Sequence, residues 1–399
     1  MVQLAIPAAN AYGLMLLIIL MGYGLVEIPR GLWFNANTRW VLKHLELKAP
    51  ALKEACVDAE SEIYEVARIL GHASTKIQPD DELRPILDKL LEKCPLALNQ
   101  RNMAEEEEGL PPTFTKSSLV VLNTRLKRAL FLNDRETAKL KTLQLQAFRC
   151  EDIIENYTRS DRRFKSLFFP VKDDKYKDEK LQFCWWWYTW IKPILMRTLC
   201  VICIIASVLI VWSESTFQFT SVELSIPQLL LAPGNFSYGT LELIAVMFIC
   251  YICCCVYWTL LNLNIFGYYE MVPNHHTDEI SLLFVGAYLC KLTFPICYNF
   301  LNMGGLAEGK VGSNGETDYS SSPVFIQYLG PAVNLTPLFG TGYNDWVPRL
   351  VVAVCFVIAF NLHGRIMKFL RIETFMYEKI GMDSNETEEG RSIIHQGNS

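Results

Sequence analysis

The pattern of apolar positions along the chain predicts five helices that cross a membrane. Each of five stretches has few charged residues and is about as long as a helix needs to be to span a hydrocarbon layer of about 30 Å. The first holds 19 residues without a charge. We predict that this helix ends at Glu27-Ile28-Pro29-Arg30, where charges and a proline follow the apolar run. The predicted spans are residues 8–26, 194–212, 241–261, 280–301 and 347–362.

Small residues interrupt the surface of the first span. Gly13, Gly22 and Gly24 leave gaps in which a neighbouring helix could approach closely. The alternative interpretation is that these glycines are merely tolerated in a membrane helix.

Between the first and second spans lies a polar insert, residues 30–182, whose apolar positions follow a heptad repeat. A first seam steps alternately by four and three residues, which is the spacing of a coiled coil. A short helix is predicted at 82–93 and a longer one, with a second seam, at 116–157. We expect the long helices to form an antiparallel hairpin; an ordinary amphipathic helix pair is the alternative. The seams are Leu52, Cys56, Ala59, Ile63, Val66 and Leu70, and Leu119, Leu126, Leu140, Ala147 and Ile154.

The distribution of lysine and arginine predicts an orientation. Basic residues follow the first span, precede the second and follow the fifth, whereas loop 213–238 has none and loop 302–346 has only Lys310. Because cytoplasmic loops carry the excess of basic residues, we predict an outside N-terminus and a cytoplasmic insert and C-terminus. Asn235 in the first outer loop begins an Asn-Phe-Ser sequon, so the chain is a candidate glycoprotein modified there, unless the sequon is a chance match.

These patterns define an all-α fold, a multi-pass helical membrane protein with five spans and a cytoplasmic helical-hairpin (coiled-coil) insert. The tail after Gly381 is polar and acidic, and we predict that it is disordered. The predicted divisions are 1–29 (first span), 30–182 (insert), 183–213 (aromatic belt and second span), 214–238 (outer loop), 239–303 (third and fourth spans), 304–346 (outer loop), 347–370 (fifth span) and 371–399 (tail).

Composition excludes several classes of function. The net charge is −5, so the chain has no overall basic field that would attract nucleic acid. Most of the 13 cysteines lie in apolar spans and none lies in an outer loop, so no disulfide framework is expected. Cys250 and Cys253 have the spacing of a metal motif but no companion ligands. No catalytic motif occurs either, so we predict no metal, no cofactor and no enzymatic activity.

An aromatic cluster precedes the second span. Trp185, Trp186, Trp187 and Trp190 are typical of the membrane interface, where large amphipathic rings favour the headgroup level. We therefore expect this segment to contact membrane lipids. Cys184 at its edge is a candidate for palmitoylation, with an unmodified thiol as the alternative.

One lysine lies in the middle of an apolar span. An ammonium group at the position of Lys291 is costly in hydrocarbon, so we expect it to face the bundle interior and to find a partner. Asn299 lies on roughly the same helix face, and Glu27 and Glu242 are candidate counter-charges. These four residues form a candidate intramembrane polar site for an ion, a lipid or a small ligand; a structural pair or a snorkelling side chain is the alternative.

Three motifs resemble the limb-region-1 family of multi-pass membrane proteins, which is related to the lipocalin-interacting membrane receptor. They are NAYGLMLLIILMGYGLVEIPRGLW (10–33) before a helical insert, HHTDEISLLF (275–284) and NLTPLFGTGYNDWVP (334–348). The family has nine spans, an outside N-terminus and a cytoplasmic coiled-coil insert after the fifth span. The resemblance therefore implies that this chain is a C-terminal part of such a protein, an expectation that its abrupt start also favours.

The family also implies a class of function. Its members are linked to lipocalin uptake, to lysosomal cobalamin export and to signalling by G-protein-coupled adrenergic receptors. We expect a receptor-associated signalling or trafficking scaffold at the plasma membrane or an endosomal or lysosomal membrane, with residues 30–182 binding protein partners. The alternative is a transporter, or a transport accessory, for a small molecule or lipid that uses the site around Lys291.

Overall fold

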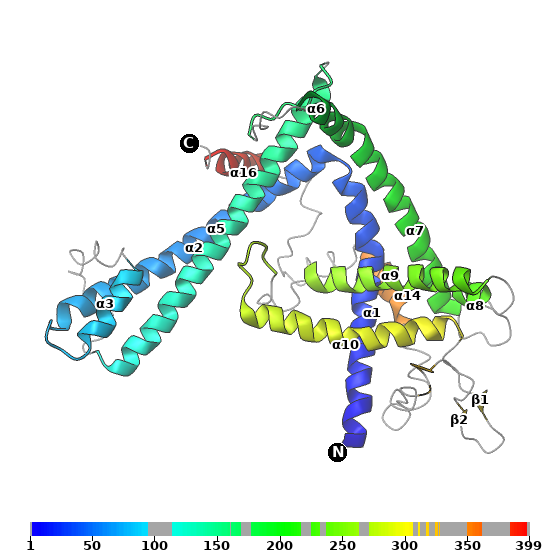
Figure 1. The fold of residues 1–399 in the computed structure, drawn as a ribbon, viewed down its shortest axis with the longest axis horizontal. Helices are drawn as coiled ribbons and strands as arrows, with labels where there is room; N and C mark the ends of the chain where they lie inside the picture. Colours follow the sequence, from blue (N-terminus) through cyan, green and yellow to red (C-terminus); the bar gives the residue numbers. More distant parts are fainter. Residues whose placement is uncertain are drawn as a thin grey trace. The chain divides into compact units, whose positions relative to one another are not determined.

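Helices dominate the computed structural model of the chain (Figure 1). It describes residues 2–94, 114–159, 161–168, 177–216, 225–231, 237–262, 271–305, 310–311, 317–318, 324–325, 327, 349–360 and 384–396. Two short strands, β1 (Lys310–Val311) and β2 (Thr317–Asp318), form an antiparallel pair. The helices are α1 (Val2–Asn35), α2 (Thr38–Lys76), α3 (Arg84–Lys93), α5 (Lys116–Thr158), α6 (Lys177–Trp186), the π-helix η2 (Trp187–Ile191), α7 (Lys192–Thr216), α8 (Ile226–Leu231), α9 (Tyr238–Asn262), α10 (Glu279–Met303), α14 (Leu350–Ala359) and α16 (Ser384–Gln396).

The chain divides into two compact units, each with its own core. The bundle unit consists of Met1–Asn37, Asp178–Met271 and Asp278–Glu378. The hairpin unit consists of Thr38–Lys177, Val272–Thr277 and Lys379–Ser399. The long apolar helices belong to the bundle unit, and α2, α3, α5 and α16 belong to the hairpin unit.

Four described segments of the bundle unit are long and apolar enough to cross a membrane. They are Ala11–Asn35, Asp178–Thr216, Tyr238–Asn262 and Glu279–Met303. The first four predicted spans overlap these segments. Of the fifth predicted span, α14 is an apolar helix of ten residues, and positions 347–348 and 361–362 lie outside the described residues.

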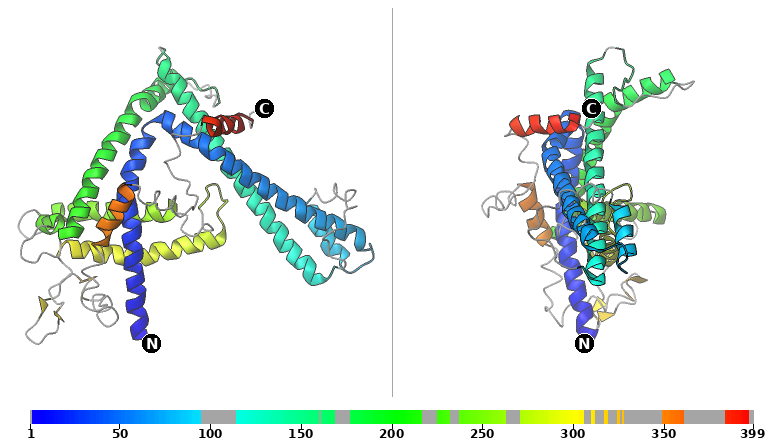
Figure 2. Two further views of the ribbon diagram at one scale, coloured as in Figure 1. Left: turned by 180° about the vertical axis from the view of Figure 1, so that it is seen from behind. Right: turned by 90° about the vertical axis from the view of Figure 1, so that its left-hand side faces the viewer.

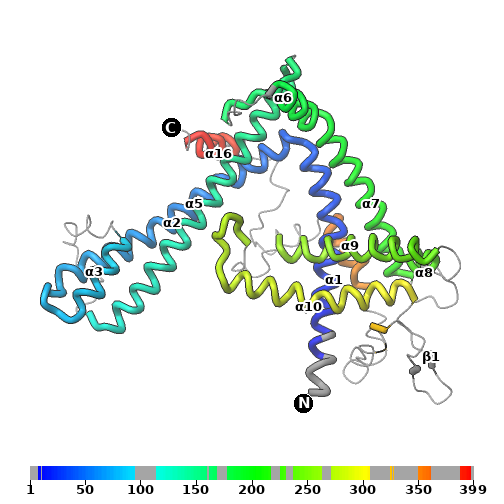
Figure 3. The backbone as a smooth tube through the Cα atoms, viewed as in Figure 1, coloured from blue at the N-terminus to red at the C-terminus, as the bar shows by residue number. Residues whose placement is uncertain are grey.

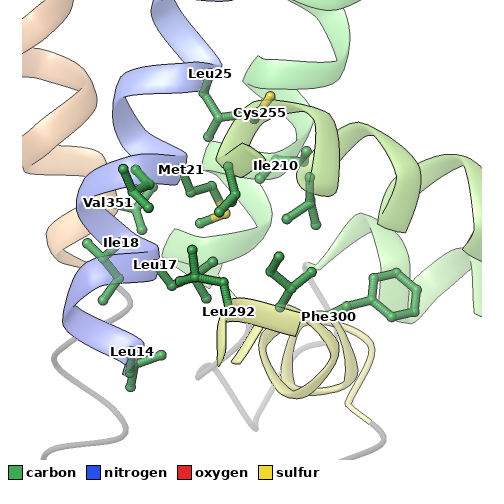
Figure 4. Packing of buried hydrophobic residues seen from close by; sticks show 14 of the residues in the cluster. Leu14, Leu17, Ile18, Met21, Leu25, Ile210, Cys255, Leu292, Phe300 and Val351 are labelled. Carbon is green, nitrogen blue, oxygen red and sulfur yellow. The ribbon is translucent and has the colours of Figure 1, made fainter. Parts of the chain in front are cut away.

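Helix α1 is the centre of the bundle core. It packs against α7, α9, α10 and α14; α9 and α10 cross it, and α14 lies beside it (Figures 1 and 2). Leu17 and Met21 are fully buried there. Figure 4 shows these side chains beside Cys255, Leu292 and Val351, which come from three other helices.

The prediction that the first helix ends at residues 27–30 is wrong, because α1 continues through Pro29 to Asn35. A proline inside a helix removes the bond to the carbonyl four residues earlier, here that of Leu25. The Ser207 hydroxyl of α7 donates a hydrogen bond of 2.7 Å to this carbonyl. Because a neighbouring helix satisfies the free carbonyl, the helix does not have to end at the proline.

The close approach predicted at the glycines of α1 is confirmed. A Cβ atom at Gly24 would lie 2.3 Å from the backbone carbonyl oxygen of Cys255 on α9. At Gly22 it would lie 2.7 Å from a methyl group of Val354 on α14, and at Gly13 it would lie 3.1 Å from Pro295 on α10. Each glycine therefore admits a different neighbour of α1.

The hairpin unit is built on the antiparallel pair of α2 and α5 (Figure 3). Val66 and Leu70, late in α2, pack with Leu119 and Leu126, early in α5, in one core cluster. Five members of the first predicted seam are buried, from Cys56 to Leu70. Burying one such leucine is worth about 1.5–3 kcal/mol, so the predicted seam accounts for the pairing. Helix α3 adds its apolar face to the same cluster.

The tail is not disordered throughout, which corrects the prediction. Residues 384–396 form α16, and Ile394 is buried with Leu45, Ala49 and Phe148 of the hairpin. The tail is acidic overall but contains two adjacent isoleucines near its end. These form the apolar face with which α16 packs on the hairpin.

Candidate functional site

Lys291 lies against the aromatic ring of Tyr12. Its ammonium nitrogen lies 4.2 Å from the centroid of the Tyr12 ring of α1, and a ring face attracts a cation. The Tyr12 hydroxyl lies 3.1 Å from that of Tyr288, one turn before Lys291. Lys291 is exposed on the bundle unit. Among the described residues, no ion pair joins it to Glu27 or Glu242.

Asn299 lies in a different, fully buried contact. Its side-chain amide donates a hydrogen bond to Oε1 of Glu214 at the end of α7, and Glu214 is 0% exposed. The second carboxylate oxygen of Glu214 has no hydrogen-bond partner among the described residues. One turn after Asn299, the carbonyl of Met303 accepts a hydrogen bond of 2.7 Å from Ser225. This contact joins α7 to α10, and it does not include Lys291.

Glu27 forms an ion pair within α1. Its carboxylate binds the guanidinium of Arg30, one turn on, and Glu27 is only 2% exposed. The same guanidinium donates hydrogen bonds to the carbonyls of Ile358 and Ala359, at 3.2 and 3.1 Å. These carbonyls belong to the last turn of α14, where a cation is favoured by the helix dipole. Arg30 therefore fastens α14 to α1.

Ser207 is the centre of a third polar contact, between α1, α7 and α9. Besides its bond to the Leu25 carbonyl, it lies 2.7 Å from the Tyr251 hydroxyl, which also donates a hydrogen bond of 3.0 Å to the Cys203 carbonyl. Ser207 also lines an apolar groove of about 460 Å³ between α1, α7 and α14. The groove contains Pro29, so the proline and the serine that compensates for it lie on one surface.

The remaining predicted residues are separate from these contacts. Glu242 is exposed near the start of α9. Cys184 is a partly buried free thiol in α6. Trp186 and Trp190, beside it, are 58% and 56% exposed, as expected of an interfacial anchor. Asn235 lies outside the described residues. The structure thus distributes the four members of the predicted intramembrane site over separate places.

The hairpin unit carries a charged groove of about 580 Å³ between α2 and α5. Arg125 on its wall binds Glu62 and Glu65 of the facing helix, each at 2.7 Å. The hydrogen bond from Arg125 lowers the pKa of the Glu62 carboxyl below its usual value. The groove is open to solvent and carries charges of both signs. Its lining is Ala55, Asp58, Ala59, Glu62, Arg125, Arg128, Ala129, Leu132 and Glu136.

Three residues that hold the bundle together were not predicted from the sequence. Ser207 could have been found, because a proline inside a membrane helix requires a donor on a neighbour. Glu214 was assigned to an outer loop, although no helix breaker separates it from the preceding apolar run. Arg30 was interpreted as part of the end of the first helix and as one of the basic residues that set the orientation.

Several long apolar helices packed on a central helix, with polar contacts between them, define a multi-pass helical membrane protein. The chain belongs to the LMBR1-like membrane protein family, whose family model matches residues 1–363.

Curated relatives match nearly the whole chain. The LMBR1 domain-containing protein 2 homolog A of Dictyostelium discoideum is 31% identical over 99% of this chain and 52% of its own length. The human G-protein coupled receptor-associated protein LMBRD2 is 30% identical over 98% of this chain and 57% of its own length. The Drosophila melanogaster LMBR1 domain-containing protein 2 homolog matches to the same extent. The chain thus spans a little more than half the length of these relatives. No solved structure matches it.

Proposed function

We propose that the chain is the part of a receptor-associated membrane protein that displays a cytoplasmic docking hairpin. The observation that carries the proposal is the charged groove on the α2–α5 pair, a solvent-open surface with charges of both signs. Apolar side chains between α2 and α5 are buried in the core of the pair, so the exposed charged faces are the surface that remains for a partner. The name of the human relative supplies the class of partner, a G-protein-coupled receptor; adrenergic receptors are the first to test.

The positive-inside pattern supports a cytoplasmic location for the hairpin. Basic residues flank the ends of the spans that border the insert, and the two loops that we predict to lie outside contain only Lys310 between them. The heptad spacing of the two seams and the burial of most of their members support a coiled-coil geometry for the pair. Both features suit a non-enzymatic scaffold that presents a rigid helical surface beside a receptor.

A charge reversal in the groove tests the proposal. Arg128 is exposed and lines the groove, whereas the neighbouring Lys127 is exposed but is not part of it. We expect the Arg128→Glu variant of the full chain to lose most of its co-purification with a co-expressed adrenergic receptor. The matched control is Lys127→Glu, which changes the net charge equally and should leave co-purification unchanged. Equal recovery of receptor by both variants would contradict a role for the groove.

A further inference from the structure

We propose that the end of the α2–α5 hairpin is a binding site for a short amphipathic helix, which α16 occupies and from which a partner's helix displaces it. The inference rests on the proposed function, because it specifies how the hairpin recognises a protein partner. Helix α16, red in Figure 2, packs on α2 and α5. Four of its contacts define what such a helix must carry.

The first contact is a close approach of two backbones. Pro50 lacks the N–H group that would bond the carbonyl of Glu46, four residues earlier in α2. Gly390 of α16 lies against this carbonyl, and a Cβ atom there would lie 1.8 Å from the oxygen. Since backbone cannot move aside as a side chain can, the position admits only glycine.

The second contact is a buried charge. The carboxylate of Glu46 is 4% exposed, and Arg391 binds it at 3.0 Å. A carboxylate taken out of water needs a cationic partner. If α16 leaves, Glu46 loses this partner, so the site favours a replacement helix that also carries a basic residue directly after the glycine.

The third and fourth contacts fix the register of the helix. Ile394 is 1% exposed and belongs to one buried cluster with Leu45, Leu143 and Ala147. His395 lies 3.1 Å from Glu151. The recognised pattern is therefore Gly-Arg-x-Ile-Ile-His, as in residues 390–395, with glycine and the second isoleucine four positions apart on one face.

The same contacts show why α16 is exchangeable. It has 13 residues, and helices of this length are marginal on their own in water. It buries one large side chain, that of Ile394, almost completely. Such a contact is favoured by the covalent link to the rest of the chain, which raises the effective concentration of the helix at its site. A helix with additional contacts can compete with it.

A labelled peptide of residues 384–396 tests the inference on the full chain in detergent or nanodiscs. We expect it to bind a Gly390→Leu chain, whose own α16 cannot dock, about ten-fold or more tighter than the wild type. A chain ended after Gly381 should behave like the Gly390→Leu chain. A designed helix that keeps only the pattern residues should also bind, and the same helix with leucine in place of glycine should not.

Two results would overturn the inference. One is equal peptide binding by wild-type and Gly390→Leu chains, with both shown to be folded by circular dichroism. The other is a wild-type dimer that the peptide dissociates, which would identify a second copy of the chain as the occupant. Peptide binding is measured without receptor, so a failure of receptor co-purification contradicts the proposed function and leaves this result standing.

Discussion

Removing the Ser207 hydroxyl should destabilise the bundle, and the loss should depend on Pro29. The hydroxyl satisfies the Leu25 carbonyl, which the proline deprives of its helical donor. An unsatisfied buried carbonyl costs about 1–3 kcal/mol, whereas interhelical hydrogen bonds in membrane proteins average about 0.6 and reach about 1.7. Ser207 is buried and its bond is short, so we expect Ser207→Ala to cost about 1–2 kcal/mol.

Restoring the backbone donor should remove most of this cost. A Pro29→Ala chain has an N–H group at position 29 that can bond the Leu25 carbonyl within α1. In that background Ser207→Ala should cost no more than about 0.5 kcal/mol, which gives a coupling energy of about 1 kcal/mol in the double-mutant cycle. The Tyr251 hydroxyl keeps its bond to the Cys203 carbonyl in every variant, so it should contribute little to the coupling.

The assay is reversible unfolding of the purified chain in mixed micelles, followed by circular dichroism across an SDS titration. Ser215→Ala is the matched control. This serine is also on α7 and lines the same groove, but its hydroxyl bonds the Val211 carbonyl of its own helix. The stability lost in Ser215→Ala should be the same with proline and with alanine at position 29. If Ser207→Ala costs the same with proline and with alanine at position 29, the explanation for the uninterrupted α1 is wrong.

Three further predictions concern other contacts. Arg30→Met should cost about 3–5 kcal/mol because it leaves the buried Glu27 unpaired; adding Glu27→Gln should recover part of the loss in thermal unfolding, and no recovery would contradict the pairing. Gly24→Ala should cost about 1–3 kcal/mol in the same assay, whereas Gly31→Ala, which meets nothing within 4 Å, should be neutral. Burial, with Lys48, lowers the pKa of His44 from 6.5 to about 4. As the pH falls, His44 therefore takes up its proton at a higher pH in the unfolded chain than in the folded chain. The free energy of unfolding should fall by about 2–3 kcal/mol between pH 6.5 and pH 4, and His44→Gln should remove this pH dependence.

The sequence predicted the elements that depend on local pattern. Lys116–Thr158 differs by one residue from the predicted long helix, and Arg84–Lys93 by two from the predicted short one. The heptad spacing predicts the long helix, and in the sequence a proline directly after Cys94 predicts the end of the short one. The glycines of α1 also predicted close packing, although not which helix would approach each of them.

The sequence could not predict partners that come from distant helices. Lys291 created the need for a partner, and the expected partner was a carboxylate because charge pairing is the commonest solution. The structure provides the ring of Tyr12, which is far away in the chain. Its hydroxyl contact with Tyr288 gave no signal in either segment alone.

Pro29 and Pro50 show the same principle in opposite settings. Each proline lies inside a helix and frees the carbonyl four residues earlier, so local rules predict a break at both. In the apolar bundle the Leu25 carbonyl receives a hydroxyl from Ser207, because no water is present to replace the lost donor. In the hairpin the Glu46 carbonyl faces Gly390 instead. At both prolines the freed carbonyl therefore lies where another helix packs closely, α7 at Leu25 and α16 at Glu46.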